Sequence, residues 1–254
     1  MRVIGIVSGK GGVGKTTVTV NLACALAQMG KDVVIVDCNV TTSHVGFYFG
    51  LQYYPITLNH VLRGESEIES AIYAHPCGIK IIPASLSLEE LKGVNIDLLK
   101  DCIKNLKKDF ILLDSAPGFG REALSVLKSC NEVLFVTIPF MNAVTDVCKA
   151  LNLLEILNLK PLGVVVNMVR NKSYELRKEE IEALTGLKVL AEIPYDPFIE
   201  LSLAKSKPSL LFNPYSPSSR SFYLLASQIV GESFNLPKIG LKAKIKNFFW
   251  KLFL

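Results

Sequence analysis

Short runs of apolar, often β-branched residues alternate along the chain with longer stretches in which apolar residues recur every three or four positions. Some runs are continuous, such as Val33-Val-Ile-Val36, which is typical of strands that helices cover on both faces. The pattern predicts strands at 2–7, 33–37, 79–83, 110–114, 132–138, 162–167 and 188–193. It predicts helices at 15–29, 96–107, 121–130, 142–158, 177–185, 198–205 and 217–231. This alternation indicates an α/β fold built on one doubly wound, mostly parallel sheet.

A glycine-rich loop joins the first predicted strand to the first predicted helix. Residues Gly9 to Thr16 fit the pattern G-x-x-x-x-G-K-[ST], the P-loop that binds the phosphates of ATP. Glycines let backbone N–H groups turn inward around the phosphates, and the N-terminus of the following helix adds a positive dipole. Lys15 is expected to reach the terminal phosphates. The predicted phosphate-binding residues are Gly11, Gly12, Val13, Gly14, Lys15, Thr16 and Thr17.

Two aspartates end predicted strands, Asp37 after 33–36 and Asp114 after 110–113. Because the carboxyl ends of parallel strands meet at one edge of the sheet, both should lie near the loop. A carboxylate in this place holds Mg²⁺ or its water ligands. The predicted magnesium ligands are therefore Thr16, Asp37 and Asp114, and the turn at Pro117-Gly118 is expected to move when the terminal phosphate leaves.

The C-terminal end of the chain has a different composition. All of the net charge of +5 can be assigned to the lysines of residues 238–254, a segment without acids. At helical spacing, apolar side chains gather on one face and lysines on the other, which is typical of a helix lying in a membrane interface. The predicted membrane-facing residues are Leu241, Ile245, Phe248, Phe249, Trp250 and Leu252. The alternative is a helix packed on the domain.

These features divide the chain into an ATPase domain (1–232), a linker (233–238) and a membrane-targeting helix (239–254). The N-terminus has no signal-peptide pattern, and no apolar run reaches the roughly 18 residues of a transmembrane helix. We therefore expect a cytoplasmic protein that associates peripherally with the inner face of the cell membrane.

The remaining chemistry-bearing residues are scattered. Six cysteines form no C-x-x-C pair, and three histidines are not at ligand spacing, which disfavours a zinc site or a disulfide framework and suits core positions in a reducing cytosol. An aromatic group is interpreted mainly as core, with a partner-binding surface as the alternative; it comprises Phe47, Tyr48, Phe49, Tyr53 and Tyr54.

The second lysine of the loop carries a family resemblance. Lys10, together with Lys15, resembles the deviant Walker A motif of the family that includes MinD, ParA, the nitrogenase iron protein and Mrp-type proteins. The resemblance extends over most of the chain, through Asp37 in switch I and the switch II sequence Asp114-Ser-Ala-Pro-Gly118. It implies that Lys10 reaches the partner's phosphates across an ATP-bound homodimer. It also implies which residues act in catalysis, namely Lys10, Lys15, Asp37, Asn39 and Asp114. Three further residues are expected to bind the adenine side of the nucleotide: Asn167, Pro194 and Asp196.

One position departs from the family pattern. Switch I normally reads D-x-D, whereas here it reads Asp37-Cys38-Asn39. An amide can hydrogen-bond a water molecule but cannot accept its proton. The resemblance with this departure therefore predicts slow ATP hydrolysis and a long-lived ATP state.

The sequence bears on four classes of function. The favoured one is a MinD-like ATPase, of archaeal type, in which ATP-dependent dimerisation drives reversible membrane binding and an unidentified regulatory or cargo protein is positioned. A ParA-like DNA-partitioning ATPase is the alternative, but residues 1–237 have no net charge, so specific nucleic-acid binding is not expected. An iron–sulfur carrier of the Mrp type would need a cysteine soon after switch II, where the next one is Cys130. The intact P-loop argues against a purely structural module.

Overall fold

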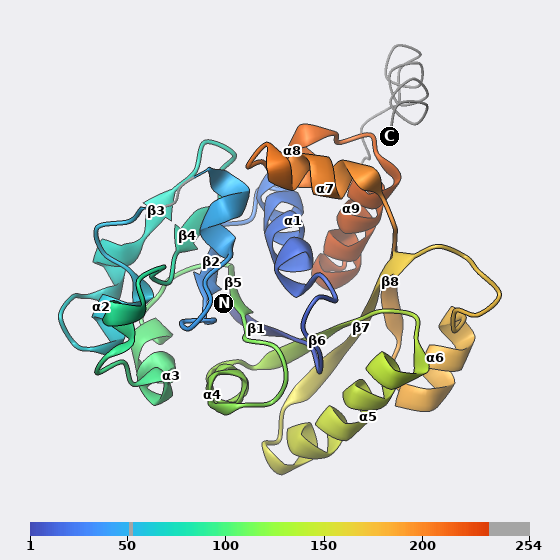
Figure 1. Cartoon of the computed structure of the whole chain (residues 1–254), viewed down its shortest axis with the longest axis horizontal. Helices are drawn as coiled ribbons and strands as arrows, with labels where there is room; N and C mark the ends of the chain where they lie inside the picture. The colour runs from blue at the N-terminus through green and yellow to red at the C-terminus, as the bar shows by residue number, and fades with distance from the viewer. Residues whose placement is uncertain (51–52, 234–254) are drawn as a thin grey trace.

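The computed structural model describes residues 1–50 and 53–233. Its centre is one eight-stranded sheet with the strand order β3-β4-β2-β5-β1-β6-β7-β8, in which β3 and β4 pair antiparallel and the other neighbours are parallel (Figure 1). The strands are β1 Arg2–Val7, β2 Val33–Asp37, β3 Tyr73–Ala74, β4 Lys80–Ile82, β5 Phe110–Asp114, β6 Glu132–Thr137, β7 Lys160–Val169 and β8 Val189–Pro194. The predicted α/β fold with a mostly parallel sheet is confirmed.

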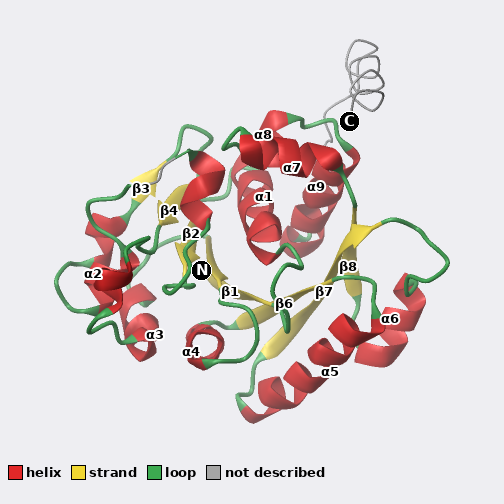
Figure 2. Ribbon diagram, in the orientation of Figure 1, coloured by secondary structure: helices red, strands yellow, loops and turns green. Residues whose placement is uncertain are grey.

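Helices cover both faces of the sheet, and each layer has its own apolar core (Figures 1 and 2). One face packs against α1 Lys15–Gln28, α7 Pro197–Ala204, α8 Ser209–Phe212 and α9 Pro217–Val230. The other packs against α2 Leu58–Leu62, α3 Leu99–Ile103, α4 Arg121–Ser129, α5 Met141–Ile156 and α6 Lys178–Thr185. Short 3₁₀ helices lie in the connections at η1 Val45–Phe49, η2 Ile68–Ala71, η3 Leu88–Leu91 and η4 Ile96–Leu98. Strands β1, β2 and β5 are almost entirely buried because both faces are covered.

The predicted helix at 96–107 is wrong in length. The chain forms η4 and then only five α-helical residues, α3, before it turns toward β5. Leu99, Ile103 and Leu106 are all buried in the same core, and a turn bond from the N–H of Leu106 to the carbonyl of Ile103 brings Leu106 inward. The apolar residues are therefore buried as their spacing indicates, but the last of them lies in a turn and not in a continuing helix. Strand β3, only two residues long, was not predicted.

The topology places the functional segments at one edge of the sheet. Strands β1, β5 and β2 run parallel and side by side, with Asp37 in register with Asp114 and Asp114 in register with Ile6. The loop that follows β1 therefore begins beside both aspartates. No helix within the described ranges, 1–50 and 53–233, is long and apolar enough to cross a membrane.

Candidate nucleotide-binding site

The glycine-rich loop runs from β1 to the first residue of α1, Lys15. Gly12 and Gly14 have positive φ angles of 77° and 83°, a backbone conformation that L side chains rarely adopt. At Gly14 space is also lacking, since a Cβ would lie 2.2 Å from Nδ2 of Asn167. The glycines thus allow the tight path that presents backbone N–H groups and the N-terminus of α1 to an anion.

Asp114 is the polar centre of the site. Its Oδ1 accepts hydrogen bonds from Nζ of Lys15 at 3.0 Å and from Oγ1 of Thr19 at 2.9 Å. Its Oδ2 accepts from Oγ1 of Thr16 at 2.6 Å. Asp114 and Lys15 are both buried, with 1% and 7% of their surface exposed. The predicted lysine, threonine and aspartate therefore meet, and the carboxylate holds the lysine and the hydroxyl together.

Asp37 lies beside Asp114 and organises switch I. Its Oδ2 accepts hydrogen bonds from Oγ of Ser43 at 2.8 Å and from the backbone N–H groups of His44 and Val45 at 3.2 and 3.1 Å. Burial, together with the negative charge of Asp114, raises the pKa of the Asp37 carboxyl from 3.8 to about 6. A nearby cation would favour the ionised form, so this pair of carboxylates suits a site that receives Mg²⁺.

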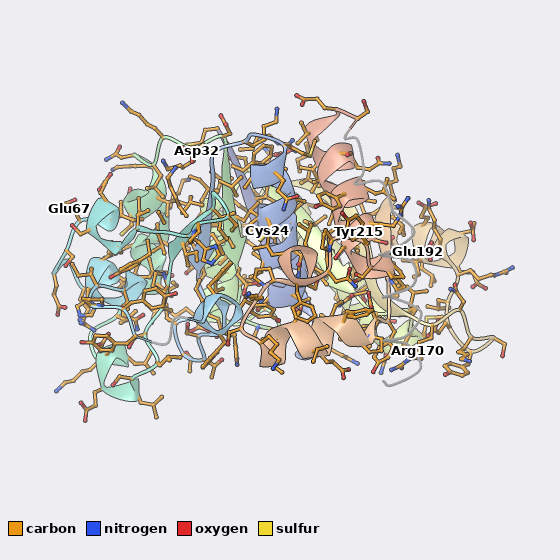
Figure 3. The ribbon with its side chains drawn as sticks, turned by 90° about the horizontal axis from the view of Figure 1, so that it is seen from above. Cys24, Asp32, Glu67, Arg170, Glu192 and Tyr215 are labelled. Atoms are coloured by element: carbon orange, nitrogen blue, oxygen red, sulfur yellow. The ribbon has the colours of Figure 1, made fainter. Side chains whose placement is uncertain are left out.

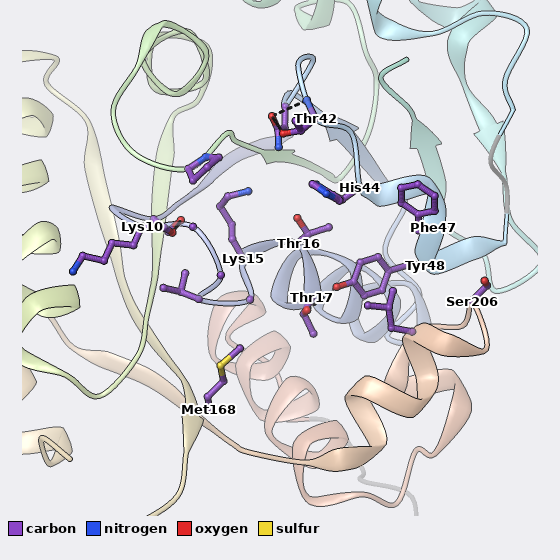
Figure 4. A pocket seen from close by; sticks show the side chains of 18 residues that line it. Lys10, Lys15, Thr16, Thr17, Thr42, His44, Phe47, Tyr48, Met168 and Ser206 are labelled. Atoms are coloured by element: carbon purple, nitrogen blue, oxygen red, sulfur yellow. Dashed lines mark hydrogen bonds between the residues drawn. The ribbon is translucent and has the colours of Figure 1, made fainter. Parts of the chain in front are cut away.

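A pocket of about 660 Å³ opens in front of the loop (Figure 4). Its lining includes the predicted loop residues from Gly11 to Thr17, Asn39 from switch I and Pro117 from switch II. The rest of the lining was not predicted: it consists of His44, Phe47 and Tyr48 around η1, of Leu203 and Ser206, and of Met168, whose Cε lies 3.6 Å from the Cβ position of Gly14 in the loop. The volume lies within the range of small-molecule sites, and the combination of loop amides with an apolar wall suits a nucleotide.

Within the aromatic group, Tyr48 and Phe49 are buried in the core, as interpreted from the sequence, whereas Phe47 faces the pocket (Figure 4). Tyr48 has a second function. Its hydroxyl forms a hydrogen bond of 2.7 Å with Oγ1 of Thr17, one of the predicted phosphate-binding residues. In this structure η1 is therefore tied to α1 through a predicted ligand residue.

Lys10, the second lysine of the loop, lines the edge of the pocket, and the end of its side chain points away from Lys15 (Figure 4). Its Nζ lies 3.9 Å from Oδ2 of Asp146 on α5, and 41% of its side chain is exposed. The same carboxylate also pairs with Lys149 at 3.3 Å. The backbone of the loop is close to α5 here, since a Cβ on Gly9 would lie 2.3 Å from the Cβ of Asp146. The lysine is thus displayed at the surface next to the site, and it does not contact Asp114 or Lys15.

Switch I and switch II are connected through α4. Asn39 is buried and its Oδ1 accepts from the backbone N–H and the hydroxyl of Thr42. Thr41, which precedes Thr42 in this turn, donates from Oγ1 to Oε1 of Glu122 on α4 at 2.6 Å. Switch II is in turn bonded to the loop, because the N–H of Gly118 donates to the carbonyl of Ser8 at 2.9 Å. The amide of Asn39 is therefore engaged in holding the turn.

Asn167 closes the loop from the side of β7. Its Nδ2 donates to the carbonyl of Val13 at 2.8 Å, while its buried Oδ1 has no hydrogen-bond partner among the described residues. A buried carbonyl oxygen without a partner costs free energy unless a ligand supplies a donor. The exocyclic amine of adenine is such a donor, but Asn167 is not among the residues that line the pocket, and its adenine role stays a prediction.

Asp196 requires a correction. Its Oδ1 accepts from the N–H of Phe198 as the N-cap of α7, and its Oδ2 accepts from the N–H and hydroxyl of Ser218 on α9. Both carboxylate oxygens thus join two helices, so the prediction of a side-chain contact with adenine is not supported. Pro194, the last residue of β8, does not line the pocket, and its role stays a prediction.

The residues present fit a magnesium–nucleotide complex. Buried Asp114 and Asp37 with the Thr16 hydroxyl form an all-oxygen donor set of the kind Mg²⁺ prefers. The glycine loop and Lys15 suit the phosphates of a nucleotide. The oxygen of Asn167, which has no partner among the described residues, suits a donor on the base. No group of three or more His, Cys, Asp or Glu side chains with metal-binding geometry occurs in ranges 1–50 and 53–233.

Comparison with known proteins agrees with this geometry. The model of the ParA family, described as NUBPL iron-transfer P-loop NTPase, matches residues 1–230. The chain belongs to the ParA/MinD family of P-loop NTPases. It is 32% identical over 250 residues to an uncharacterized ATP-binding protein of Methanocaldococcus jannaschii, covering 98% of this chain and 94% of that protein.

Among solved structures, the cell division ATPase MinD of Pyrococcus furiosus superposes with a TM-score of 0.88 at 35% identity, covering 91% of this chain and 98% of the other. The septum site-determining protein MinD of Pyrococcus horikoshii, solved with Mg-ADP, gives 0.86 at 34%, with coverages of 90% and 95%. ATP and Mg²⁺ are the cofactors of this ParA/MinD family, which confirms the cofactors predicted from the loop.

Several residues of the site escaped sequence reasoning. Thr19 lies one helical turn beyond Thr16, so helical spacing could have placed its hydroxyl on the same side as Asp114. Ser43 and Tyr48 had no such signal, because their contacts depend on how switch I folds back over the loop. The predicted membrane-facing residues, from Leu241 to Leu252, lie outside the described residues.

Proposed function

We propose that this ParA/MinD-family protein is a MinD-like ATPase whose ATP-dependent dimerisation drives reversible membrane binding, in cell division or spatial positioning. The main supporting observation is the placement of Lys10. It belongs to the phosphate-binding loop and lines the edge of the pocket, yet the end of its side chain points away from Lys15, and among the described residues its ammonium pairs only with Asp146, at 3.9 Å. A lysine so placed is available to a second copy of the chain.

The buried network suggests how nucleotide state changes the site. Lys15 and Thr16 are held by Asp114, and both are residues whose polar atoms suit phosphate and Mg²⁺. When Lys15 and Thr16 turn to a bound nucleotide, Asp114 loses these two hydrogen-bond partners. The end of β5, which leads into switch II, is then no longer held to α1 through them. The bond from Gly118 to Ser8 lies on this path, so switch II is the segment expected to respond.

Hydrolysis is proposed to be slow. Bound nucleotide supplies the phosphoryl group, and the protein must orient water against it. Asn39 lines the pocket but has an amide that cannot accept a proton, and its oxygen is bonded to Thr42. The dimer would therefore persist in its ATP state long enough for the membrane to retain it.

The C-terminal segment supplies the membrane contact in this proposal. Helix α9 ends at Val230 with Gly231 as its cap, and Glu232 pairs with Lys31 at 2.9 Å. The lysine-rich amphipathic sequence follows within a few residues. One such helix binds a bilayer weakly, and two on one dimer raise the effective concentration enough to gain about 10²-fold or more.

The test is sedimentation of the full chain with anionic liposomes in the presence of Mg-ATP or Mg-ADP. We expect strong sedimentation with ATP and much less with ADP, and loss of both in a chain ending at Pro237. Lys10→Ala should abolish the ATP-dependent part while ATP binding persists. Lys149→Ala is the matched control, since it removes the other lysine beside Asp146 without touching the loop. Equal sedimentation in ATP and ADP would contradict the coupling, and normal sedimentation of Lys10→Ala would contradict the role of Lys10.

A further inference from the structure

A tyrosine outside the glycine-rich loop is bonded to one of the predicted phosphate-binding residues. Helix α1 occupies the centre of the molecule when it is seen from above, and its first turn carries Thr17 (Figure 3). The hydroxyl of Tyr48, on η1, lies 2.7 Å from Oγ1 of Thr17, and both residues line the pocket, with 7% and 8% of their surface exposed (Figure 4). The hydroxyl pair therefore joins two elements at the wall of the nucleotide pocket.

The two hydroxyls have one hydrogen more than their mutual bond uses. Each hydroxyl can donate one hydrogen and can also accept. Neither Oγ1 of Thr17 nor the hydroxyl of Tyr48 has another hydrogen-bond partner among the described residues. Thr19, two positions further along α1, has the carbonyl of Lys15 and the carboxylate of Asp114 as acceptors. One hydrogen of the Tyr48–Thr17 pair is therefore left for an acceptor that a ligand supplies.

A bound phosphate determines which hydroxyl donates to the other. Ionised phosphate oxygens accept hydrogen bonds, so a hydroxyl that binds them must donate. Thr17 is the member of the pair that lies on the first turn of α1, where the backbone N–H groups and the helix dipole attract an anion. When Thr17 donates to phosphate, its oxygen accepts from Tyr48, whose phenolic hydroxyl is the more acidic donor of the two.

The 3₁₀ helix that carries the tyrosine is held at both ends. At its first residue, the N–H of Val45 donates to Oδ2 of Asp37 at 3.1 Å. At its C-cap, the Cβ position of Gly50 lies 3.5 Å from the Cβ of Ser206, in the turn that follows α7. Phe49, next to the tyrosine, is buried in the core. Moving η1 away would expose this apolar surface, so the hydroxyl is already in place when a nucleotide arrives.

We propose that Tyr48 is a positioning residue for the nucleotide: its hydroxyl donates to Oγ1 of Thr17 and so directs the Thr17 hydrogen onto a phosphate oxygen. Consecutive hydrogen bonds strengthen one another, because each donation polarises the group that donates next. Tyr48 acts through Thr17 and contacts no phosphate itself. Its role depends on nucleotide binding at the loop, which the proposed function also requires, but not on dimerisation or on the membrane. The loop of a P-loop protein surrounds the α- and β-phosphates, so ATP and ADP share the contact.

The experiment is a double-mutant cycle in the affinity of the full chain for Mg-ADP, measured by isothermal titration calorimetry, so that hydrolysis plays no part. We expect Tyr48→Phe to weaken binding by about threefold to tenfold, the size of one neutral hydrogen bond, and Thr17→Val by about tenfold or more. In the Thr17→Val background, Tyr48→Phe should change the affinity by less than about twofold, because its partner is gone. Thr17→Ser keeps the hydroxyl, so in that background Tyr48→Phe should again cost about threefold to tenfold.

Tyr73→Phe is the matched control. The Tyr73 hydroxyl also has partners inside the fold, the backbone N–H and carbonyl of Ile56 at 3.0 and 2.9 Å, but Tyr73 does not line the pocket. This variant should bind Mg-ADP as the wild type does, and circular dichroism checks that every variant is folded.

Two results would overturn the role of Tyr48. One is an unchanged affinity of Tyr48→Phe. The other is an equal loss from Tyr48→Phe with and without the Thr17 hydroxyl, because the tyrosine would then act on the nucleotide directly or only through the packing of η1. A wild type that does not bind Mg-ADP would instead contradict the proposed function itself, so the two failures are distinguishable.

Discussion

The buried ion pair between Lys15 and Asp114 allows a sharp test of what holds the empty site together. In Asp114→Asn the strand end keeps its size, but the carboxylate that accepts from Lys15, Thr16 and Thr19 becomes a neutral amide. Lys15 then remains with only 7% of its surface exposed and without its ion pair, since the carboxylate of Asp37 lies nearby but does not bond to it in the described structure. The unpaired buried charge is the dominant cost, because the two threonine hydroxyls can turn toward the remaining amide oxygen.

The expected loss in the free energy of unfolding is about 3–5 kcal/mol, measured without nucleotide or magnesium. The same principle predicts the size of the rescue. If the cost arises from the stranded ammonium, removing it should restore stability. The double variant Lys15→Met, Asp114→Asn should therefore recover more than about half of the loss, since the methionine has a similar length and no charge.

The test is a double-mutant cycle, measured by urea denaturation and followed by circular dichroism. It compares the wild type, Asp114→Asn, Lys15→Met and the double variant. Unfolding with a common m value keeps the comparison valid. The reasoning fails if the losses of the two single variants simply add in the double variant. It also fails if Asp114→Asn loses less than about 1 kcal/mol, because Lys15 would then have escaped to solvent.

Three further predictions follow from the site. Because the pKa of Asp37 is raised from 3.8 to about 6, the folded protein binds a proton between these two pH values that the unfolded chain does not bind. As the pH falls from 7 to 4, this group should therefore raise the free energy of unfolding of the nucleotide-free protein by up to about 3 kcal/mol. Denaturation of Asp37→Asn at several pH values in the presence of a chelator should show a correspondingly flatter rise. Gly14→Ala should weaken nucleotide binding in a fluorescent-nucleotide titration by at least about tenfold, because it requires a φ of 83° and displaces Nδ2 of Asn167, which lies 2.2 Å from the new Cβ; binding as tight as that of the wild type would refute this. Asn39→Asp should raise the single-turnover rate of ATP hydrolysis several-fold by adding a group that can accept the water's proton, and an unchanged rate would remove this residue from the catalytic account.

The nucleotide site illustrates what an ordered motif can determine. The spacing of Gly9 to Thr17 requires neighbouring residues to act together, so the loop, its strand and its helix were predicted within a residue or so. Asp37 and Asp114 were placed correctly for a related reason: continuous apolar runs indicate parallel strands, and parallel strands bring their carboxyl ends to one edge. Local sequence contains this information because the residues involved belong to single elements with fixed periodicity.

Where the sequence failed, the cause was contact between elements. Nothing near Asp196 indicates that Ser218 will occupy its second oxygen, and nothing near Thr17 indicates Tyr48. The spacing of Leu99, Ile103 and Leu106 suits a helix, yet burial of Leu106 through a turn ended it early. Such pairings depend on how loops cross the end of the sheet, which short-range patterns do not specify.

The sequence by itself determined the fold class, the mostly parallel sheet and the glycine-rich loop that lines the pocket, because each depends on local periodicity or on a contiguous motif. Only the tertiary structure decided that the end of the Lys10 side chain lies near Asp146, that Asn167 keeps an oxygen without a partner among the described residues, and that Tyr48 bonds to Thr17. The physical reason is common to all three. Each depends on how groups on separate elements are placed, and on distances and a burial that exist only after the sheet and its two layers of helices have assembled.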